Sequence, residues 1–218
     1  MTRSAFTTEL RSRQTDPAGR RWVYAPYDQL TSSVGPLSRE DPRELGLILV
    51  ESPDKAARRP YHRQKLALVL ANQRHFALEQ ASRGVAVHYT VSPGNYADAL
   101  IRLIDELELA SPPRLMRPAE RELRNELQPL VEAGRLEVVP HEGWLTTTDQ
   151  FDRSQRGKKA AGFRMDAFYR LVRRESDVLM EAGKPAGGKF SFDAANRKPW
   201  PGDPPAPVLP RFEPDGVT

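Results

Sequence analysis

The feature that most constrains the fold of this chain is the alternation of short apolar runs with longer amphipathic stretches. The apolar runs have the composition of buried strands, and five strands are predicted, over residues 22–24, 45–51, 85–90, 114–116 and 136–140. Helical periodicity predicts helices over residues 62–83, 95–109, 118–134 and 163–181. Strands that alternate with helices pair in parallel through right-handed crossovers. We therefore expect an α/β fold, with a Rossmann-like, five-stranded, mostly parallel sheet and helices on both faces.

Charge and proline are both concentrated toward the C-terminus. Residues 153–198 hold twelve Lys or Arg and five Asp or Glu, a net charge of +7, whereas the rest of the 218 residues hold 21 and 24. Eight of the 20 prolines lie between Pro185 and Pro214, where they disfavour regular helix. We expect a flexible N-terminus over residues 1–20, an α/β domain over residues 21–183, and an extended, Pro-rich tail over residues 184–218.

Several chemistries are excluded by composition and motif. The chain has no cysteine, which rules out disulfides, thiolate zinc sites and cysteine-held iron–sulfur clusters. Residues 183–189 match the GxxxxGK spacing of a phosphate-binding loop, but Phe190 replaces the required Ser or Thr and the segment follows a predicted helix rather than a strand. No GxGxxG motif follows the first strand, and the spacing of the four histidines does not indicate a metal site.

Targeting signals are also absent from the sequence pattern. No apolar stretch approaches the roughly 18 residues that a membrane span needs. The first twenty residues lack the apolar segment of a secretory signal. We expect a cytoplasmic protein without a membrane partner.

A parallel sheet of this kind binds ligands in the crevice beyond the carboxyl ends of its strands. Polar residues follow the first two predicted strands, among them Asp28 and Gln29 after the first and Glu51 and Lys55 at the end of the second. The alternative is that these are ordinary loops in which Asp28 is a turn or capping residue.

Three segments of the chain resemble a known family. They are residues 22–31 (WVYAPYDQLT), residues 47–89 (beginning LILVESPDKAARRPYHRQK) and residues 163–202 (beginning FRMDAFYRLVRRESDVLMEAGKP). From about Arg21 to its end, the chain resembles the N-terminal α/β domain of the photolyase-related proteins, a branch of the cryptochrome/photolyase family that includes bacterial iron–sulfur photolyases.

This resemblance implies an antenna domain of a light-dependent DNA-repair flavoprotein, a lyase of the deoxyribodipyrimidine photolyase type. In that family, FAD and the iron–sulfur cluster belong to a C-terminal helical domain, and this chain stops where that domain is expected to begin. The resemblance therefore implies a domain that is not catalytic on its own and has no catalytic residues. Its implied partner is a flavin domain, in cis or from a separate chain.

The resemblance also implies two sets of binding residues. A ribityl-lumazine antenna pigment would contact Asp28, Gln29, Glu51, Lys55 and Val69. Two positions depart from the family pattern, because Tyr27 stands where relatives commonly have Gly, and Lys55 stands where an acidic residue is expected. A bulky ring and a reversed charge would exclude the pigment or select another one.

The residues implied to contact DNA are Asn196, Arg197 and Lys198, in the segment GGKFSFDAANRKP. The basic charge around them supports phosphate contacts, although the same charge could simply solvate a helix face. Two other functions stay open: a free-standing α/β module that binds a nucleotide-like or flavin-like small molecule in the same crevice, and a nucleic-acid-binding accessory that acts through the basic third alone.

Overall fold

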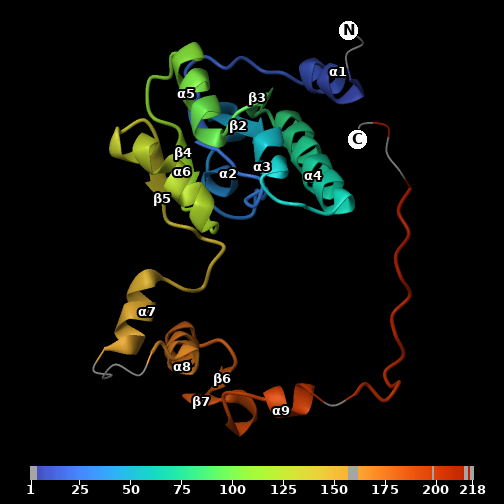
Figure 1. The fold of residues 1–218 in the computed structure, drawn as a ribbon, viewed down its shortest axis with the longest axis vertical. Coiled ribbons are helices and arrows are strands. Elements are labelled where there is room, and N and C mark those ends of the chain that lie inside the picture. Colours follow the sequence, from blue (N-terminus) through green and yellow to red (C-terminus); the bar gives the residue numbers. More distant parts are fainter. Residues whose placement is uncertain (1–3, 157–161, 198, 214–215, 217–218) are drawn as a thin grey trace. The chain divides into compact units, whose positions relative to one another are not determined.

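The computed structural model of the chain describes residues 4–156, 162–197, 199–213 and 216 (Figure 1). The chain forms two compact units, which meet in the sequence between Glu142 and Gly143. The sequence analysis expected the α/β domain to continue to Gly183.

The first unit contains one five-stranded parallel sheet. Its strands are β1 (Arg21–Tyr24), β2 (Leu45–Glu51), β3 (Ala86–Val91), β4 (Arg114–Met116) and β5 (Glu137–Val139), and their order is β3-β2-β1-β4-β5. Its helices are α1 (Ala5–Ser12), α2 (Pro36–Arg39), α3 (Pro53–Ala57), α4 (Arg63–Ser82), α5 (Tyr96–Glu106) and α6 (Arg121–Glu132), with a short 3-10 turn at Pro42–Glu44. The prediction of a Rossmann-like α/β fold with five strands is confirmed.

Hydrophobic cores lie on both faces of the sheet because successive side chains of a strand point to opposite faces. In β2, Leu45, Leu47 and Leu49 pack toward α1 and α4, whereas Ile48 and Val50 pack toward α5 and α6. Figure 1 shows these helices around the sheet. With both faces covered, the carboxyl ends of the strands are left as the place where loops can surround a ligand.

One glycine is required by close packing between two strands. Gly46 of β2 pairs with Trp22 of β1, and a Cβ atom at Gly46 would overlap the indole ring of Trp22. Gly46 therefore allows a large aromatic ring to lie flat against the backbone of the neighbouring strand.

The N-terminal segment contains a helix that the sequence analysis did not anticipate. It expected a flexible segment over residues 1–20, but α1 begins after the capping side chain of Ser4 and buries Phe6 and Leu10 against the sheet core. Arg13, just after the helix, donates to Ser82 Oγ at 2.8 Å. Two apolar residues one turn apart are enough for α1 to pack, and they are too few to give a clear periodic signal.

The second unit is built from short elements. They are α7 (Thr148–Gln155), α8 (Met165–Ser176), β6 (Met180–Glu181), β7 (Lys184–Pro185), a 3-10 turn at Ala186–Gly188 and α9 (Asp193–Asn196). The predicted helix over 163–181 is wrong at its end, because α8 stops at Asp177, which has the left-handed φ of 55°. An antiparallel hairpin of β6 and β7 follows, and its turn residues Ala182 and Gly183 both have positive φ.

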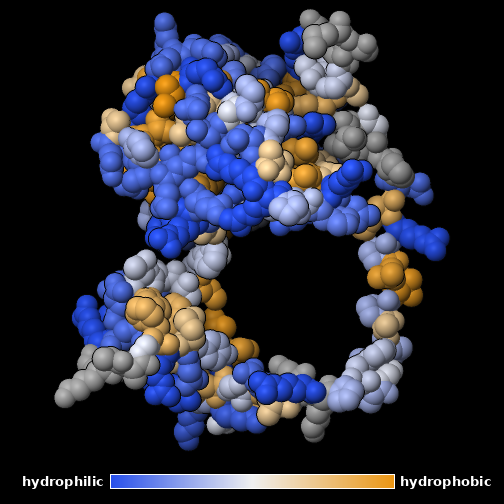
Figure 2. Space-filling view, in the orientation of Figure 1, coloured by the Kyte–Doolittle hydropathy of each residue, from blue (hydrophilic) through white to orange (hydrophobic). Residues whose placement is uncertain are grey.

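The side chain of Arg173 holds this unit together. It is 5% exposed, and it donates to the carbonyl oxygens of Val178, Leu179 and Phe190. Figure 2 shows hydrophobic side chains at the surface of the unit, in keeping with an exposed fraction of 78% for Phe163. No helix or strand is present in the described residues 199–213, all of which are exposed.

Candidate functional site at the carboxyl edge of the sheet

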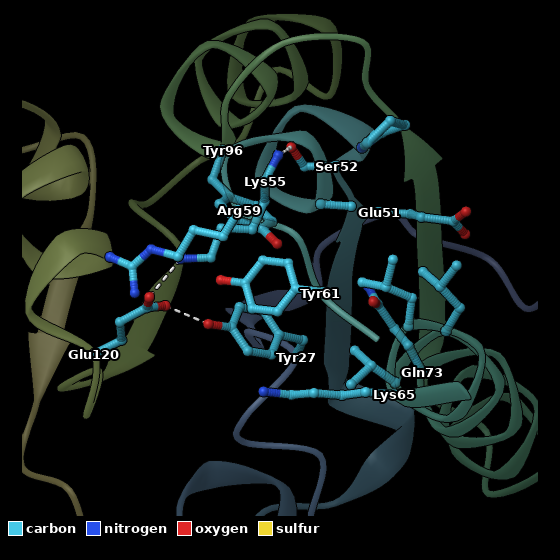
Figure 3. Close-up of a pocket in the computed structure, with 15 residues that line it drawn as sticks. Tyr27, Glu51, Ser52, Lys55, Arg59, Tyr61, Lys65, Gln73, Tyr96 and Glu120 are labelled. Carbon is cyan, nitrogen blue, oxygen red and sulfur yellow. Dashed lines mark hydrogen bonds and ion pairs between the residues drawn. The ribbon is translucent and has the colours of Figure 1, made fainter. Parts of the chain in front are cut away.

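A pocket of about 460 Å³ lies at the carboxyl edge of the sheet (Figure 3). This volume is in the range of small-molecule sites, which is roughly 300–1,000 Å³. The pocket is lined by Tyr27, Glu51, Ser52, Pro53, Lys55, Ala56, Arg59, Tyr61, Lys65, Leu66, Val69, Leu70, Gln73, Tyr96 and Glu120. These residues come from the loops after β1, β2, β3 and β4 and from α4, so the pocket lies at the edge of the sheet where the crevice rule expects a ligand.

The apolar wall of the pocket is the first half of α4. None of the residues 63–72 is buried, although Leu66, Val69 and Leu70 face the cavity. The second half of the same helix buries Phe76, Ala77 and Leu78 in the core, together with further residues. The helix therefore extends past the core and presents an aliphatic surface to the pocket.

Three tyrosines provide aromatic surface. Tyr27 follows β1, Tyr61 precedes α4 and Tyr96 begins α5, and the rings of Tyr27 and Tyr96 are stacked with their centroids 6.3 Å apart. Aromatic and aliphatic surface around a few polar groups is the composition of a site for a planar, partly apolar molecule.

One carboxylate organises the polar side of the pocket. Glu120 accepts hydrogen bonds from the Tyr27 hydroxyl and the Lys55 ammonium group, as Figure 3 shows. Burial alone would raise the pKa of Glu120, but the hydrogen bonds from Lys55 and Tyr27 lower it below its ordinary value. Burial and the bond to Glu120 raise the pKa of Tyr27 well above its ordinary value, so its hydroxyl keeps its proton.

Glu120 is available for this role because of where α6 begins. The sequence analysis started this helix at Pro118, but it starts at Arg121, and Glu120 is its N-cap without a side-chain capping bond. Its carboxylate is therefore free to reach Tyr27 and Lys55.

Glu51 lies at the opposite side of the pocket and is held by other partners. Its carboxylate accepts a hydrogen bond of 2.6 Å from the Tyr89 hydroxyl and pairs with Arg74 at 3.2 Å. In Figure 3 this carboxylate points away from Tyr61. Gln73, which is 2% exposed, donates to the carbonyl oxygen of Val50 at 2.9 Å and so ties α4 to the end of β2.

The structure places three of the five pigment-binding residues expected from the sequence in the pocket wall, namely Glu51, Lys55 and Val69. Asp28 is exposed and does not line the pocket. Gln29 is 4% exposed and donates to the carbonyl oxygen of Met116 at 2.9 Å, so its side chain joins the loop after β1 to β4.

Sequence reasoning missed six of the lining residues with polar tips, which are Arg59, Tyr61, Lys65, Gln73, Tyr96 and Glu120. The crevice rule was applied only to the first two strands. Had it been applied to the loop after residues 114–116, it would have pointed to Glu120.

The residues expected to contact DNA belong to the second unit. Arg197 is exposed and follows α9, and Asn196 is the last residue of that helix. The side chain of Asn196 and the whole of Lys198 lie outside the residues that the structure describes.

The described residues lack two features that would indicate other functions. They contain no helix that is long and apolar enough to cross a membrane. Within residues 4–156, 162–197, 199–213 and 216, no group of three or more His, Asp or Glu is placed to hold a metal ion.

Comparison with known proteins gives a family and two relatives. The model of the family described as deoxyribodipyrimidine photo-lyase-related protein matches residues 21–218. A (6-4) photolyase of Agrobacterium fabrum is 30% identical over 200 residues, which cover 88% of this chain and 38% of that protein. An uncharacterized protein of Acanthamoeba polyphaga mimivirus is 39% identical over 59 residues, which cover 26% of this chain and 30% of that protein.

The chain therefore spans well under half the length of the photolyase that it matches. The match of the family model covers nearly all of the chain, including both the pocket and the second unit. This chain belongs to the deoxyribodipyrimidine photo-lyase-related protein family.

Proposed function

We propose that this chain is the antenna domain of a light-dependent DNA-repair flavoprotein and that its pocket holds an aromatic pigment. The observation that carries the proposal is the 460 Å³ pocket at the carboxyl edge of the sheet, with one aliphatic wall and three tyrosines. A domain with this role needs to bind and orient a pigment rather than to carry out a reaction on it.

The residues of the pocket fit a ribityl-lumazine. A fused heteroaromatic ring is accommodated by Leu66, Val69 and Leu70 on α4 and by the rings of Tyr27 and Tyr61. The hydroxyl groups of a ribityl chain need hydrogen-bonding partners, and polar side chains line the rest of the cavity. When bound, such a pigment absorbs light and passes the excitation energy to a flavin by dipole coupling.

The two departures from the family pattern do not fill the pocket. Tyr27 and Lys55 both donate hydrogen bonds to Glu120, and the cavity of about 460 Å³ remains with both side chains in place. Glu120 also supplies a carboxylate beside Lys55, where the family pattern led us to expect an acidic residue. In this proposal, the bonds to Glu120 fix the ring of Tyr27 as one wall of the site.

The energy acceptor would be a flavin-binding domain, in the same polypeptide or from a separate chain. The matched region makes up 38% of the (6-4) photolyase of Agrobacterium fabrum. By the resemblance of this chain to the photolyase-related proteins, FAD and the iron–sulfur cluster would belong to a domain outside the matched region. Repair chemistry in this proposal belongs to that domain.

A titration with a ribityl-lumazine tests the proposal. Binding should change the absorption and fluorescence of the pigment and should raise the melting temperature of the protein. Val69→Trp places a large ring in the cavity and should weaken binding at least about tenfold, because overpacking removes the space for the ligand.

Leu68→Trp is the matched control, since Leu68 is the preceding residue of α4, is 61% exposed and does not line the pocket. It should bind like the wild type. If no ribityl-lumazine or flavin binds, the antenna proposal is wrong. If a plain nucleotide binds and the pigments do not, the free-standing nucleotide-binding module replaces it.

A second proposal concerns DNA, and it rests on the basic side chains of the second unit. Arg153 and Arg170 are engaged in ion pairs with Glu175 and Asp166. Seven further basic residues of the unit are exposed, and no ion pair is described for them: Arg156, Arg164, Arg174, Lys184, Lys189, Arg197 and Arg211. We propose that they give the chain a weak, salt-sensitive affinity for DNA phosphates.

A further inference from the structure

The charged groups around the pocket do not balance one another. Lys55 is paired with Glu120, and Arg59 is paired with Glu122. Glu51 is paired with Arg74. These pairs leave one lining cation, Lys65, for which the described part of the chain provides no ion pair.

Lys65 lies where it can reach a bound ligand. It lines the pocket one residue before Leu66, and its ammonium group is 5.2 Å from the centre of the Tyr61 ring. Figure 3 shows the side chain extending away from α4, toward the part of the pocket where Tyr27 and Tyr61 lie. A flat ligand against Tyr61 and Val69 would therefore have this cation at its edge.

The start of α4 adds a second source of positive potential. The first turn of a helix carries a partial positive charge and usually holds acidic residues. In α4 that turn contains Arg63 and Lys65 and no acidic residue. No ion pair is described for Arg63 either, among the residues for which the structure gives contacts. Two cations at the positive end of a helix are unfavourable by themselves, and an anion bound nearby would relieve the repulsion.

We infer that the occupant of the pocket is an anionic aromatic molecule, whose planar ring lies against Tyr61 and Val69 and whose phosphate or other acidic group binds Lys65. This inference rests on the proposed pigment site and goes beyond it, because a ribityl-lumazine carries no phosphate. A pigment with a phosphorylated ribityl chain has the required ring, length and charge.

The test uses two ligands that differ only in the phosphate, riboflavin and flavin mononucleotide, together with a ribityl-lumazine. Flavin fluorescence is titrated with the full 218-residue chain at two salt concentrations. The mononucleotide should bind about tenfold more tightly than riboflavin at low salt, the size of effect that one charge-assisted hydrogen bond gives. The preference should shrink at high salt, because Lys65 is exposed to solvent.

Variants at Lys65 test whether this residue causes the preference for the mononucleotide over riboflavin. Lys65→Met should remove the preference, so that this variant binds the mononucleotide and riboflavin with about equal affinity. Lys65→Arg should keep most of the preference. Lys184→Met, which removes an exposed lysine of the second unit, should behave like the wild type. The melting temperature of each variant checks that it is folded.

The outcomes separate this inference from the antenna proposal. If riboflavin or the ribityl-lumazine binds as tightly as the mononucleotide, or if the preference survives Lys65→Met, the anionic ligand is wrong and the pigment site stands. If none of the three ligands binds, the pigment site fails and the inference fails with it.

Discussion

Breaking the ion pair between Lys55 and Glu120 should destabilise the first unit, whereas removing both charges together should cost little more than removing one. The two side chains are 12% and 25% exposed, so either charge left alone is largely removed from water. Breaking a fully buried pair costs about 3–5 kcal/mol. Here each survivor keeps a second partner, because Glu122 lies 3.4 Å from the Lys55 ammonium group and the Tyr27 hydroxyl still donates to Glu120. We therefore expect about 2 kcal/mol for Lys55→Met and for Glu120→Gln, and about 2 kcal/mol for the double variant.

The assay is urea unfolding of the four proteins, followed by circular dichroism. The double-mutant cycle should give a coupling energy of about 2 kcal/mol, and each single variant should lower the melting temperature by about 8 °C. The surface pair Arg135 and Asp105, which is 34% and 62% exposed, provides the comparison, and its cycle should give less than about 0.5 kcal/mol. Additive single-variant effects at Lys55 and Glu120 would refute the view that Glu120 is the organising charge of the pocket.

Three further results are expected. Gly46→Ala should destabilise the chain by about 3 kcal/mol in urea unfolding, because the added methyl group would overlap a neighbouring tryptophan ring. Gly94→Ala should cost under about 1 kcal/mol, because the nearest atom to a Cβ at that position is 3.6 Å away. The folded-state pKa of Glu120 lies below its unfolded value of 4.5. The ionised carboxylate therefore stabilises the folded protein above pH 4.5, and this stabilisation is lost as the pH falls through the folded pKa. Between about pH 6 and pH 3, the melting temperature should fall less steeply for Glu120→Gln than for the wild type. Duplex DNA should bind with a dissociation constant of about 1–100 μM, measured by fluorescence anisotropy, and Arg197→Ala should reduce the log–log salt slope by about 1. Equal losses of affinity in Arg197→Ala and Arg21→Ala would contradict DNA binding through the second unit.

The sheet could be predicted from the sequence because its strands are buried on both faces. A strand such as β2, with six consecutive buried residues, must be apolar throughout, and that pattern is hard to mistake. The end of α8 could not be predicted in this way, because Val178 and Leu179 continue the helical spacing of apolar residues. What stops the helix is the left-handed conformation of Asp177 and the hairpin turn at Gly183, and both depend on local backbone geometry.

The candidate site could be predicted only in part, for a related reason. Glu51 and Lys55 were found because they follow a clear strand directly, and the position of a strand end is a local property of the sequence. Glu120 pairs with Lys55 across 65 positions of the chain, and nothing local in the sequence indicates that contact. Long-range ion pairs are set by the fold, so a rule based on strand ends finds the edge of the sheet and misses the partners that meet there.

The shape of the pocket follows from what holds its two walls. The first half of α4 leaves the core with Leu66, Val69 and Leu70 only partly covered, so apolar packing does not close the cavity on that side. The opposite wall, the segment around Lys55, is tied by an ion pair to Glu120 rather than to α4. Tyr27 and Lys55, the two residues that depart from the family pattern, both bond to Glu120, and the cavity stays open beside them.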